Sequence, residues 1–223
     1  MARPASMSRQ PDPTASISYE EFLDWADEDT LAEWVDGVVL MASPASVRHQ
    51  LVATFLQELV TTFVKVHTLG VVLPPPFQME LERSGREPDL LYLADAHRDR
   101  MKETYLDGPA DLVVEIVSPE SAERDRGDKF HEYQDARIPE YWLIDPRIEQ
   151  GAFYQLDSEG RYQGTPLDTG HGMYQSRIVA GFRLRLEWLW EDPLPDPTHA
   201  LLEIDREAYA AYLREQMRQA GLE

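Results

Sequence analysis

Hydrophobic and polar positions change their spacing several times along this chain. Ser18 and Glu21 form a Ser-x-x-Glu pair ahead of an apolar stretch, which predicts a short capped helix. Asp36-Gly37 stands between two short apolar runs and is typical of a two-residue β-hairpin. From residue 46 to residue 69 apolar side chains recur at helical spacing, and Gly70 follows where a C-terminal cap belongs. The pattern predicts a helix, a hairpin and a long helix.

The middle of the chain has the pattern of a sheet. Short strands are expected at residues 71–73, 77–81 and 89–93, with a turn at Ser84-Gly85. Residues 110–117 are almost continuously apolar and rich in β-branched side chains, as in a central strand buried on both faces. The pattern then predicts a charged helix and three more strands, at residues 120–136, 140–145, 152–156 and 175–179. This order predicts an α/β (α+β) fold, in which helices flank a mixed central sheet that carries an N-terminal β-hairpin extension.

The two ends of the chain differ from this central part. Residues 1–15 combine prolines with small polar residues, which predicts a disordered arm before a domain over residues 16–195. Prolines at 193, 195 and 197 then precede a C-terminal amphipathic helix within residues 196–223. The apolar stripe of this helix must be buried on the core or on a second copy, so we expect a homodimer.

Composition narrows the classes of function. The 223 residues include 21 Lys and Arg and 41 Asp and Glu, a net charge of −20, so the free protein should bind DNA weakly. The absence of cysteine excludes disulfides and thiolate metal sites, so any metal must bind to oxygen or imidazole. No long apolar run or signal-type N-terminus is present, so we expect a cytoplasmic protein without a membrane span.

Glu115 is the residue in the central strand that most needs an explanation. An ionised carboxylate inside an apolar strand costs several kcal/mol, roughly, unless it is paired, protonated or bound to a cation. Asp89 begins the preceding strand, so the two carboxylates could meet at one Mg²⁺ or Mn²⁺ ion. On the following helix Asp125, Lys129 and Tyr133 are spaced four apart and share a face, which could direct an ammonium and a phenol into the same pocket.

A family resemblance covers residues 17–190. It is carried by the hairpin residues 33–37, the helix start from Ser43-Pro44 to His49, Pro88-Asp89-Leu90, and the dense segments 111–119, 125–133 and 138–145. These segments resemble the Uma-two family of restriction endonucleases, within the PD-(D/E)XK nuclease superfamily. The resemblance implies a restriction-endonuclease-like core in which Asp89 and Glu115 bind a divalent metal for hydrolysis of DNA.

This chain departs from the superfamily motif at one position. Two residues after Glu115, where the motif has a lysine, stands Val117, whose side chain cannot stabilise charge. The resemblance suggests that Lys129, on the following helix, takes the role of the motif lysine. The predicted catalytic set is therefore Asp89, Glu115 and Lys129.

Each candidate residue also has a purely structural interpretation. Asp89 could be a turn residue after Pro88, and Glu115 could form a structural salt bridge, for instance to Lys129. Accessory candidates with ordinary alternatives are Glu33 as an edge charge, His49 as a helix-surface residue, Asp125 as the exposed partner of Lys129, Tyr133 as a core residue, and Asp111 as an exposed strand start. The mixed run 123–129 could contact DNA or be a solvated helix face.

Three functions therefore remain open from the sequence. The first is a Mg²⁺- or Mn²⁺-dependent endonuclease that hydrolyses DNA phosphodiester bonds. The second is a catalytically inactive or partner-dependent interaction module that keeps the nuclease fold, since the strand lysine is missing and the net charge is −20. The third is a metal-dependent hydrolase of a small phosphoester.

Overall fold

The fold consists of two main sheets with helices on both sides, seen in a computed structural model that describes residues 16–27, 29–165 and 170–222. The predicted arm over residues 1–15 lies outside this part of the chain. The larger sheet has the strand order β11-β10-β9-β8-β6-β3. Its strands are β3 (Gly70–Leu73), β6 (Leu90–Ala94), β8 (Leu112–Ile116), β9 (Glu140–Asp145), β10 (Gln150–Leu156) and β11 (Tyr162–Gly164).

The larger sheet is mixed, as the sequence predicts. β8 and β9 run parallel, and the other neighbouring strands pair antiparallel. Every residue of β8 is buried, in agreement with a central strand covered on both faces. Leu112, Val114 and Ile116 face one half of the core, and Val113 faces the other. Because side chains alternate along a strand, Glu115 points to the same side as Val113.

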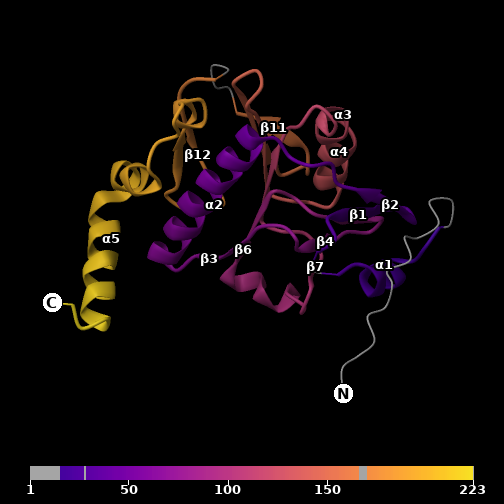
Figure 1. Cartoon of the computed structure of the whole chain (residues 1–223), viewed down its shortest axis with the longest axis horizontal. Coiled ribbons are helices and arrows are strands. Elements are labelled where there is room, and N and C mark those ends of the chain that lie inside the picture. The colour runs from indigo at the N-terminus through magenta and orange to yellow at the C-terminus, as the bar shows by residue number, and fades with distance from the viewer. Residues whose placement is uncertain (1–15, 28, 166–169, 223) are drawn as a thin grey trace.

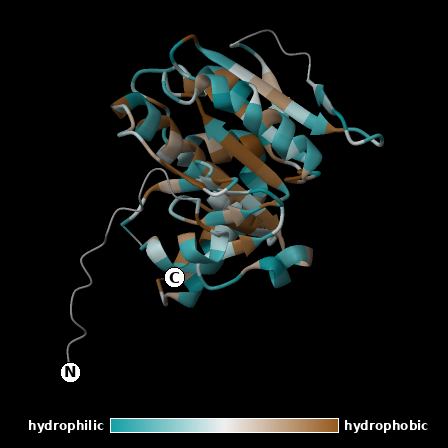
Figure 2. Cartoon of the chain, turned by 90° about the vertical axis from the view of Figure 1, so that its right-hand side faces the viewer, coloured by the Kyte–Doolittle hydropathy of each residue, from teal (hydrophilic) through white to brown (hydrophobic). Residues whose placement is uncertain are grey.

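Helices cover the two faces of this sheet. The long helix α2 (Val47–His67) packs on one face, with α5 (Pro197–Gln219) beside it (Figure 1). The short helices α3 (Ala122–Arg126) and α4 (Asp128–Asp135) cover the opposite face next to the β1-β2 hairpin (Figure 1). Figure 2 shows hydrophobic strands inside the molecule and mostly hydrophilic residues on the outer helices. None of the described helices is long and apolar enough to cross a membrane.

The smaller sheet extends the N-terminal side of the core. Its order is β2-β1-β5-β4-β7, built from β1 (Ala32–Val35), β2 (Val38–Met41), β4 (Gln78–Glu80), β5 (Ser84–Arg86) and β7 (Tyr105–Asp107). The predicted hairpin is confirmed, since Asp36 and Gly37 adopt positive φ angles of 49° and 90° between β1 and β2. The predicted capping box is also present, with Ser18 and Glu21 at the start of α1 (Tyr19–Trp25).

Two expectations about glycines are wrong. Gly85 lies in strand β5 and not in a turn, because it pairs with Trp34 on β1 and Glu80 on β4. The ring of Tyr19 packs so closely that a Cβ at Gly85 would lie 2.3 Å from it, which favours glycine here. Gly70 begins β3, and the left-handed cap of α2 is Thr68, with φ of 53°. In both places a contact or a strand pairing distant in sequence determines the local structure.

The expected helix over residues 120–136 is two helices. Gly127 separates α3 from α4 with φ and ψ of −115° and −85°, outside the helical region. The expected strand at 175–179 is also displaced: β12 (Met173–Gln175) pairs with β13 (Arg183–Arg185) in a separate hairpin. Two short 3₁₀ segments, η1 (Asp95–Arg100) and η2 (Leu186–Leu189), complete the elements.

The C-terminal helix α5 bends at Asp205, whose backbone angles are not helical. Before and just after the bend, Leu201, Ile204 and Tyr209 are buried in the same core cluster as α2. Leu213 and Met217, further along, are exposed. Leu201 and Ile204 of the predicted apolar stripe are thus covered within one chain, and contact of the exposed Leu213 with a second copy stays a prediction.

Candidate active site

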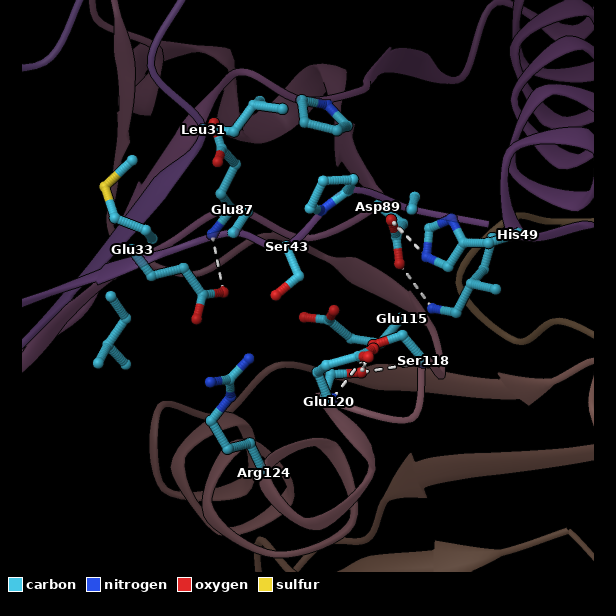
Figure 3. Close-up of a pocket in the computed structure, with 18 of the residues that line it drawn as sticks. Leu31, Glu33, Ser43, His49, Glu87, Asp89, Glu115, Ser118, Glu120 and Arg124 are labelled. Carbon is cyan, nitrogen blue, oxygen red and sulfur yellow. Dashed lines mark hydrogen bonds and ion pairs between the residues drawn. The ribbon is translucent and has the colours of Figure 1, made fainter. Parts of the chain in front are cut away.

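A cavity of about 480 Å³ opens between the β1-β2 hairpin, the start of α2 and the ends of β6 and β8. Figure 3 shows several carboxylates pointing into it from different elements. The charged side chains among its lining residues are Glu33, His49, Glu87, Asp89, Glu115, Glu120, Arg124 and Lys129. The cavity therefore combines five carboxylates with three groups that can carry positive charge.

Strand pairing brings Asp89 and Glu115 together. β6 and β8 are antiparallel, with Leu90 opposite Val114. Asp89, the residue immediately before β6, therefore lies opposite Glu115. The Asp89 Oδ2 atom accepts a hydrogen bond from the Ile116 backbone N–H at 2.7 Å. The two carboxylates that the sequence singles out as metal ligands thus line one cavity from neighbouring strands.

Glu115 is buried and receives two hydrogen bonds on one oxygen. Lys129 Nζ donates to Glu115 Oε1 at 2.9 Å, and the Tyr133 hydroxyl donates to the same atom at 2.6 Å. Within the described residues no hydrogen bond reaches Oε2. The salt bridge that was the structural alternative for Glu115 is therefore formed, yet it leaves one carboxylate oxygen free for a ligand from the cavity.

Lys129 is shared by three carboxylates. Its Nζ lies 2.9 Å from Glu115, 2.8 Å from Glu33 and 3.6 Å from Asp125. The Lys129 side chain is only 5% exposed, which excludes the solvated surface pair considered from the sequence. One buried ammonium thus serves three acidic groups, and the cluster has an excess of negative charge.

Burial raises the pKa of the carboxylates in this cluster, whereas the neighbouring cations lower it. Burial, together with Asp125, Asp89 and Glu33, raises the pKa of Glu115 above its usual range although Lys129 opposes the shift. Burial also disfavours the charged form of Glu33, but Lys129 and Arg86 outweigh it and lower the pKa of Glu33 to about 2. Glu115 is therefore the carboxylate that gains most from additional positive charge.

Glu33 enters the site from the smaller sheet. Its Oε2 accepts a hydrogen bond from Arg86 NH1 at 3.0 Å, and Arg86 on β5 also binds Glu132 on α4, with Nε donating at 2.8 Å. Arg86 is buried although it is charged. The accessory candidate Glu33 is thus a fixed part of the site, held by the pairing of β1 with β5.

His49 lies beside Asp89 at the start of α2. Its Nε2 is 3.4 Å from Asp89 Oδ1, and its Nδ1 is buried with no hydrogen-bond partner in the described part of the chain. Burial favours the neutral imidazole, but the Asp89 carboxylate outweighs this effect and raises the pKa of His49. A histidine expected on a helix surface is instead a buried neighbour of a candidate ligand.

The remaining predicted residues divide into two groups. Asp125 on α3 and Tyr133 on α4 both reach the site, although Gly127 separates the two helices. Burial raises the pKa of Asp125, and its carboxylate oxygens have no hydrogen-bond partner in the described chain. Asp111 lies at the other end of β8, where it is buried, accepts a hydrogen bond from Ala94 N–H at 2.8 Å and contacts His97 at 2.8 Å. The third carboxylate considered from the sequence is therefore a structural residue distant from the cavity.

Several site residues were missed or undervalued from the sequence. Burial, with help from Glu33, raises the pKa of Glu87 to about 7, and its Oε1 is buried without a hydrogen bond from the described residues. Glu87 stands two residues before Asp89, and this strand-like spacing is the signal that could have identified it. Arg86 gives no local signal, because its role depends on the pairing of two distant strands.

Two carboxylates of the cavity could contribute oxygen ligands to a hard divalent cation. Within the described ranges, no three His, Asp or Glu side chains lie close enough together to bind one metal ion. The described residues of the chain therefore supply at most two ligands to such an ion. The free Glu115 Oε2 and the Asp89 carboxylate are oxygen donors of the kind that Mg²⁺ and Mn²⁺ bind while keeping several waters. The excess negative charge around Lys129 would be offset by such an ion.

Comparisons with known proteins identify the family and the fold. A family model described as "Putative restriction endonuclease", Uma2, matches residues 19–187. A solved structure with a similar fold, a "putative nuclease belonging to DUF820" from Anabaena variabilis ATCC 29413, has a TM-score of 0.66 and 14% identity, covering 78% of this chain and 97% of that one. A search of curated proteins gave no significant match. The predicted fold class is confirmed, and the chain belongs to the Uma2 family.

Proposed function

We propose that this protein is a divalent-metal-dependent endonuclease that hydrolyses DNA phosphodiester bonds. The observation that carries the proposal is the placement of Asp89 and Glu115 on neighbouring strands in one cavity, next to the buried Lys129. Membership of the Uma2 family supports nuclease activity in general. The dependence on a divalent metal and the choice of DNA as the substrate go beyond this family membership and are proposed from the geometry of the cavity.

Asp89 and Glu115 would hold Mg²⁺ or Mn²⁺, which, when bound, supplies Lewis acidity at phosphate and lowers the pKa of water. The residues of the chain position this chemistry. The Ile116 N–H orients Asp89, while Lys129 and Tyr133 fix Glu115 through Oε1 and leave Oε2 toward the cavity. The Lys129 ammonium also stabilises negative charge that develops on a phosphate next to Glu115.

A competing possibility is an inactive or partner-dependent module with the same fold. It is favoured by Val117, which is buried where the superfamily motif has lysine, and by the net charge of −20. Lys129 is also tied to three carboxylates, so less of its charge is available to a substrate. Activity measurements decide between the two possibilities.

The test is cleavage of supercoiled plasmid and single-stranded DNA at low salt with Mg²⁺, Mn²⁺ or EDTA. Wild type should cleave only with metal, and Glu115→Gln should lose at least about a hundredfold in rate, since it removes a ligand but preserves side-chain size. Asp145→Asn, a matched buried carboxylate on the next strand, should retain activity. Absence of cleavage by wild type under every condition would favour the inactive module, and full activity of Glu115→Gln would reject the assigned site.

A further inference from the structure

The three cationic or potentially cationic residues of the cavity are not equivalent. Lys129 is ion-paired with three carboxylates, and His49 is paired with Asp89. Arg124 also lines the cavity but makes no hydrogen bond or ion pair with any residue in the described ranges. Among the arginines of the described chain, Arg124 combines a place in the cavity wall with a buried Nε atom that lacks a hydrogen-bond partner.

Arg124 points into the cavity from α3. Figure 3 shows its side chain rising from the helix, with the guanidinium directed toward the side of the cavity where Glu33 and Glu115 lie. Its Nε atom is buried and has no hydrogen-bond partner in the described chain. A buried N–H without a partner destabilises the folded protein, and a ligand in the cavity that accepts a hydrogen bond would offset this cost.

The next arginine along the chain shows that the acidic surface can satisfy such a group. Arg126, two residues later on α3, binds Asp145 at 2.8 Å and does not line the cavity. Asp145 also binds Arg147 at 2.8 Å, so Asp145 keeps one arginine if Arg126 is removed. Arg126 is thus a matched residue of the same type and charge with a structural role.

We propose that Arg124 binds a phosphodiester anion in this cavity and positions it next to Asp89 and Glu115. The planar guanidinium can donate two parallel hydrogen bonds to two phosphate oxygens, a geometry that lysine does not offer. The proposal rests on the proposed function and adds the residue that selects the anion. Arg124 would supply the positive charge that Lys129, already paired, supplies only in part.

Binding of a fluorescent single-stranded oligonucleotide, followed by anisotropy across a range of KCl concentrations, tests this role. Measurement with Ca²⁺ and with EDTA separates binding from cleavage. Arg124→Ala should weaken binding about tenfold and reduce the slope of log K against log salt by about 0.7, the value for one phosphate contact. Arg124→Lys should recover part of the affinity, because it restores the charge but not the paired hydrogen bonds.

Arg126→Ala is the control, since it removes one positive charge from the same helix. It should bind the oligonucleotide as wild type does, within about twofold. A loss in Arg126→Ala equal to that in Arg124→Ala would show that net charge alone matters, and would overturn the proposal.

A small diester distinguishes the source of the anion. Bis(4-nitrophenyl) phosphate should compete with the oligonucleotide in wild type and not in Arg124→Ala if the site recognises any phosphodiester. Competition at concentrations comparable to those of the oligonucleotide would assign the site to small phosphoesters, whereas competition only in large excess would assign it to nucleic acid.

Failure of this inference and failure of the proposed function give different results. Unchanged binding and cleavage by Arg124→Ala would overturn the role of Arg124 and leave the endonuclease intact. Binding that depends on Arg124 without any metal-dependent cleavage would keep the anion site and reject the endonuclease. Absence of oligonucleotide and diester binding by wild type at every salt concentration would overturn the role of Arg124.

Discussion

Two buried carboxylates on neighbouring parallel strands have opposite electrostatic environments. Asp145, at the end of β9, accepts hydrogen bonds from the backbone and guanidinium of Arg147 and from the guanidinium of Arg126. Glu115, on β8, receives one ammonium, which it shares with Glu33 and Asp125, and one phenol. Asp145 is thus paired with two guanidinium groups, whereas Glu115 shares a single ammonium with two other carboxylates.

Titration reflects this difference. Burial opposes ionisation of Asp145, but the hydrogen bonds from Arg147 and Arg126 outweigh it and lower the pKa to about 2. Burial dominates at Glu115 and raises its pKa. A buried carboxylate with complete compensation needs nothing more, whereas an under-compensated one can bind a further cation. The comparison therefore separates a structural carboxylate from a candidate ligand without reference to any family.

The largest effect is expected from Lys129→Met, which removes the only ammonium of the cluster. Glu115 and Asp125 would lose their paired cation and Glu33 would keep Arg86 alone, so the free energy of unfolding at pH 7 should fall by about 3–5 kcal/mol. Urea denaturation in EDTA measures this loss. Lys102→Met is the control, because Lys102 pairs with Asp107 on the surface and should change stability by less than about 0.5 kcal/mol.

A double variant sharpens this result. Glu115→Gln added to Lys129→Met removes one of the uncompensated charges, so the double variant should be more stable than Lys129→Met alone. Equal stability of the two would show that Lys129 does not compensate Glu115, and would break the comparison with Asp145.

The second effect is stabilisation by metal. Mg²⁺ or Mn²⁺ at about ten times its dissociation constant should add about 1.4 kcal/mol, a rise in Tm of about 3–6 °C for a domain of this size. The rise should persist in Asp145→Asn and disappear in Glu115→Gln. Thermal unfolding followed by circular dichroism measures it, and an equal rise in both variants would place the ion elsewhere.

Removal of the compensated carboxylate should have a somewhat smaller effect. Asp145→Asn should reduce stability at pH 7 by about 1 kcal/mol, since Arg126 and Arg147 are partly exposed and water replaces part of the interaction. The folded-state pKa of Asp145 is below its ordinary value of 3.8, so its contribution is present above about pH 4 and lost as pH falls through about 2. Urea midpoints of wild type and variant should therefore stay apart at about pH 5 and draw closer as the pH falls from about 4 toward about 2; a difference that does not change with pH would contradict the ion pair.

The local features of the fold could be predicted from the sequence. The Ser18 capping box, the Asp36-Gly37 hairpin and the 3.6-residue period of α2 depend on neighbours within a few positions. The local pattern does not predict the places of Gly85 and Gly70, because each is set by pairing with a strand distant in sequence, β1 in one case and β6 in the other. Glycine signals freedom of the backbone, and only the tertiary structure determines how that freedom is used.

The grouping of Glu115 with Lys129 and Tyr133 could be predicted, because these residues lie on β8 and the helices after it. Lys129 and Tyr133 follow Glu115 within one βα unit, so their spacing along the chain already brings them near it. Arg86 and Glu87 belong to the site because β5 pairs with β1. That the Arg124 guanidinium has no acidic partner in the described chain becomes visible only once the whole cavity is formed. Whether the charge of a buried carboxylate is balanced depends on all the charged residues that the fold brings near it, and a local sequence pattern does not show which residues these are.

Tyr133→Phe removes one hydrogen bond to Glu115 Oε1 and no charge, so its effect should match that of Asp145→Asn at high pH and become the smallest of all as the pH falls. Stability should fall by about 1 kcal/mol at high pH. The phenol stabilises the ionised carboxylate, so the loss should shrink as pH falls and Glu115 takes up a proton. Tyr141→Phe is the matched control: its hydroxyl donates to the neutral Asp125 backbone carbonyl at 3.0 Å, so its loss should not depend on the charge of Glu115. Urea denaturation of both variants from pH 5 to pH 9, a range of about four units around neutrality, compares them. Parallel pH profiles would mean that Tyr133 does not respond to the charge of Glu115, whereas diverging profiles would identify Glu115 as the carboxylate whose ionisation the site leaves incompletely compensated.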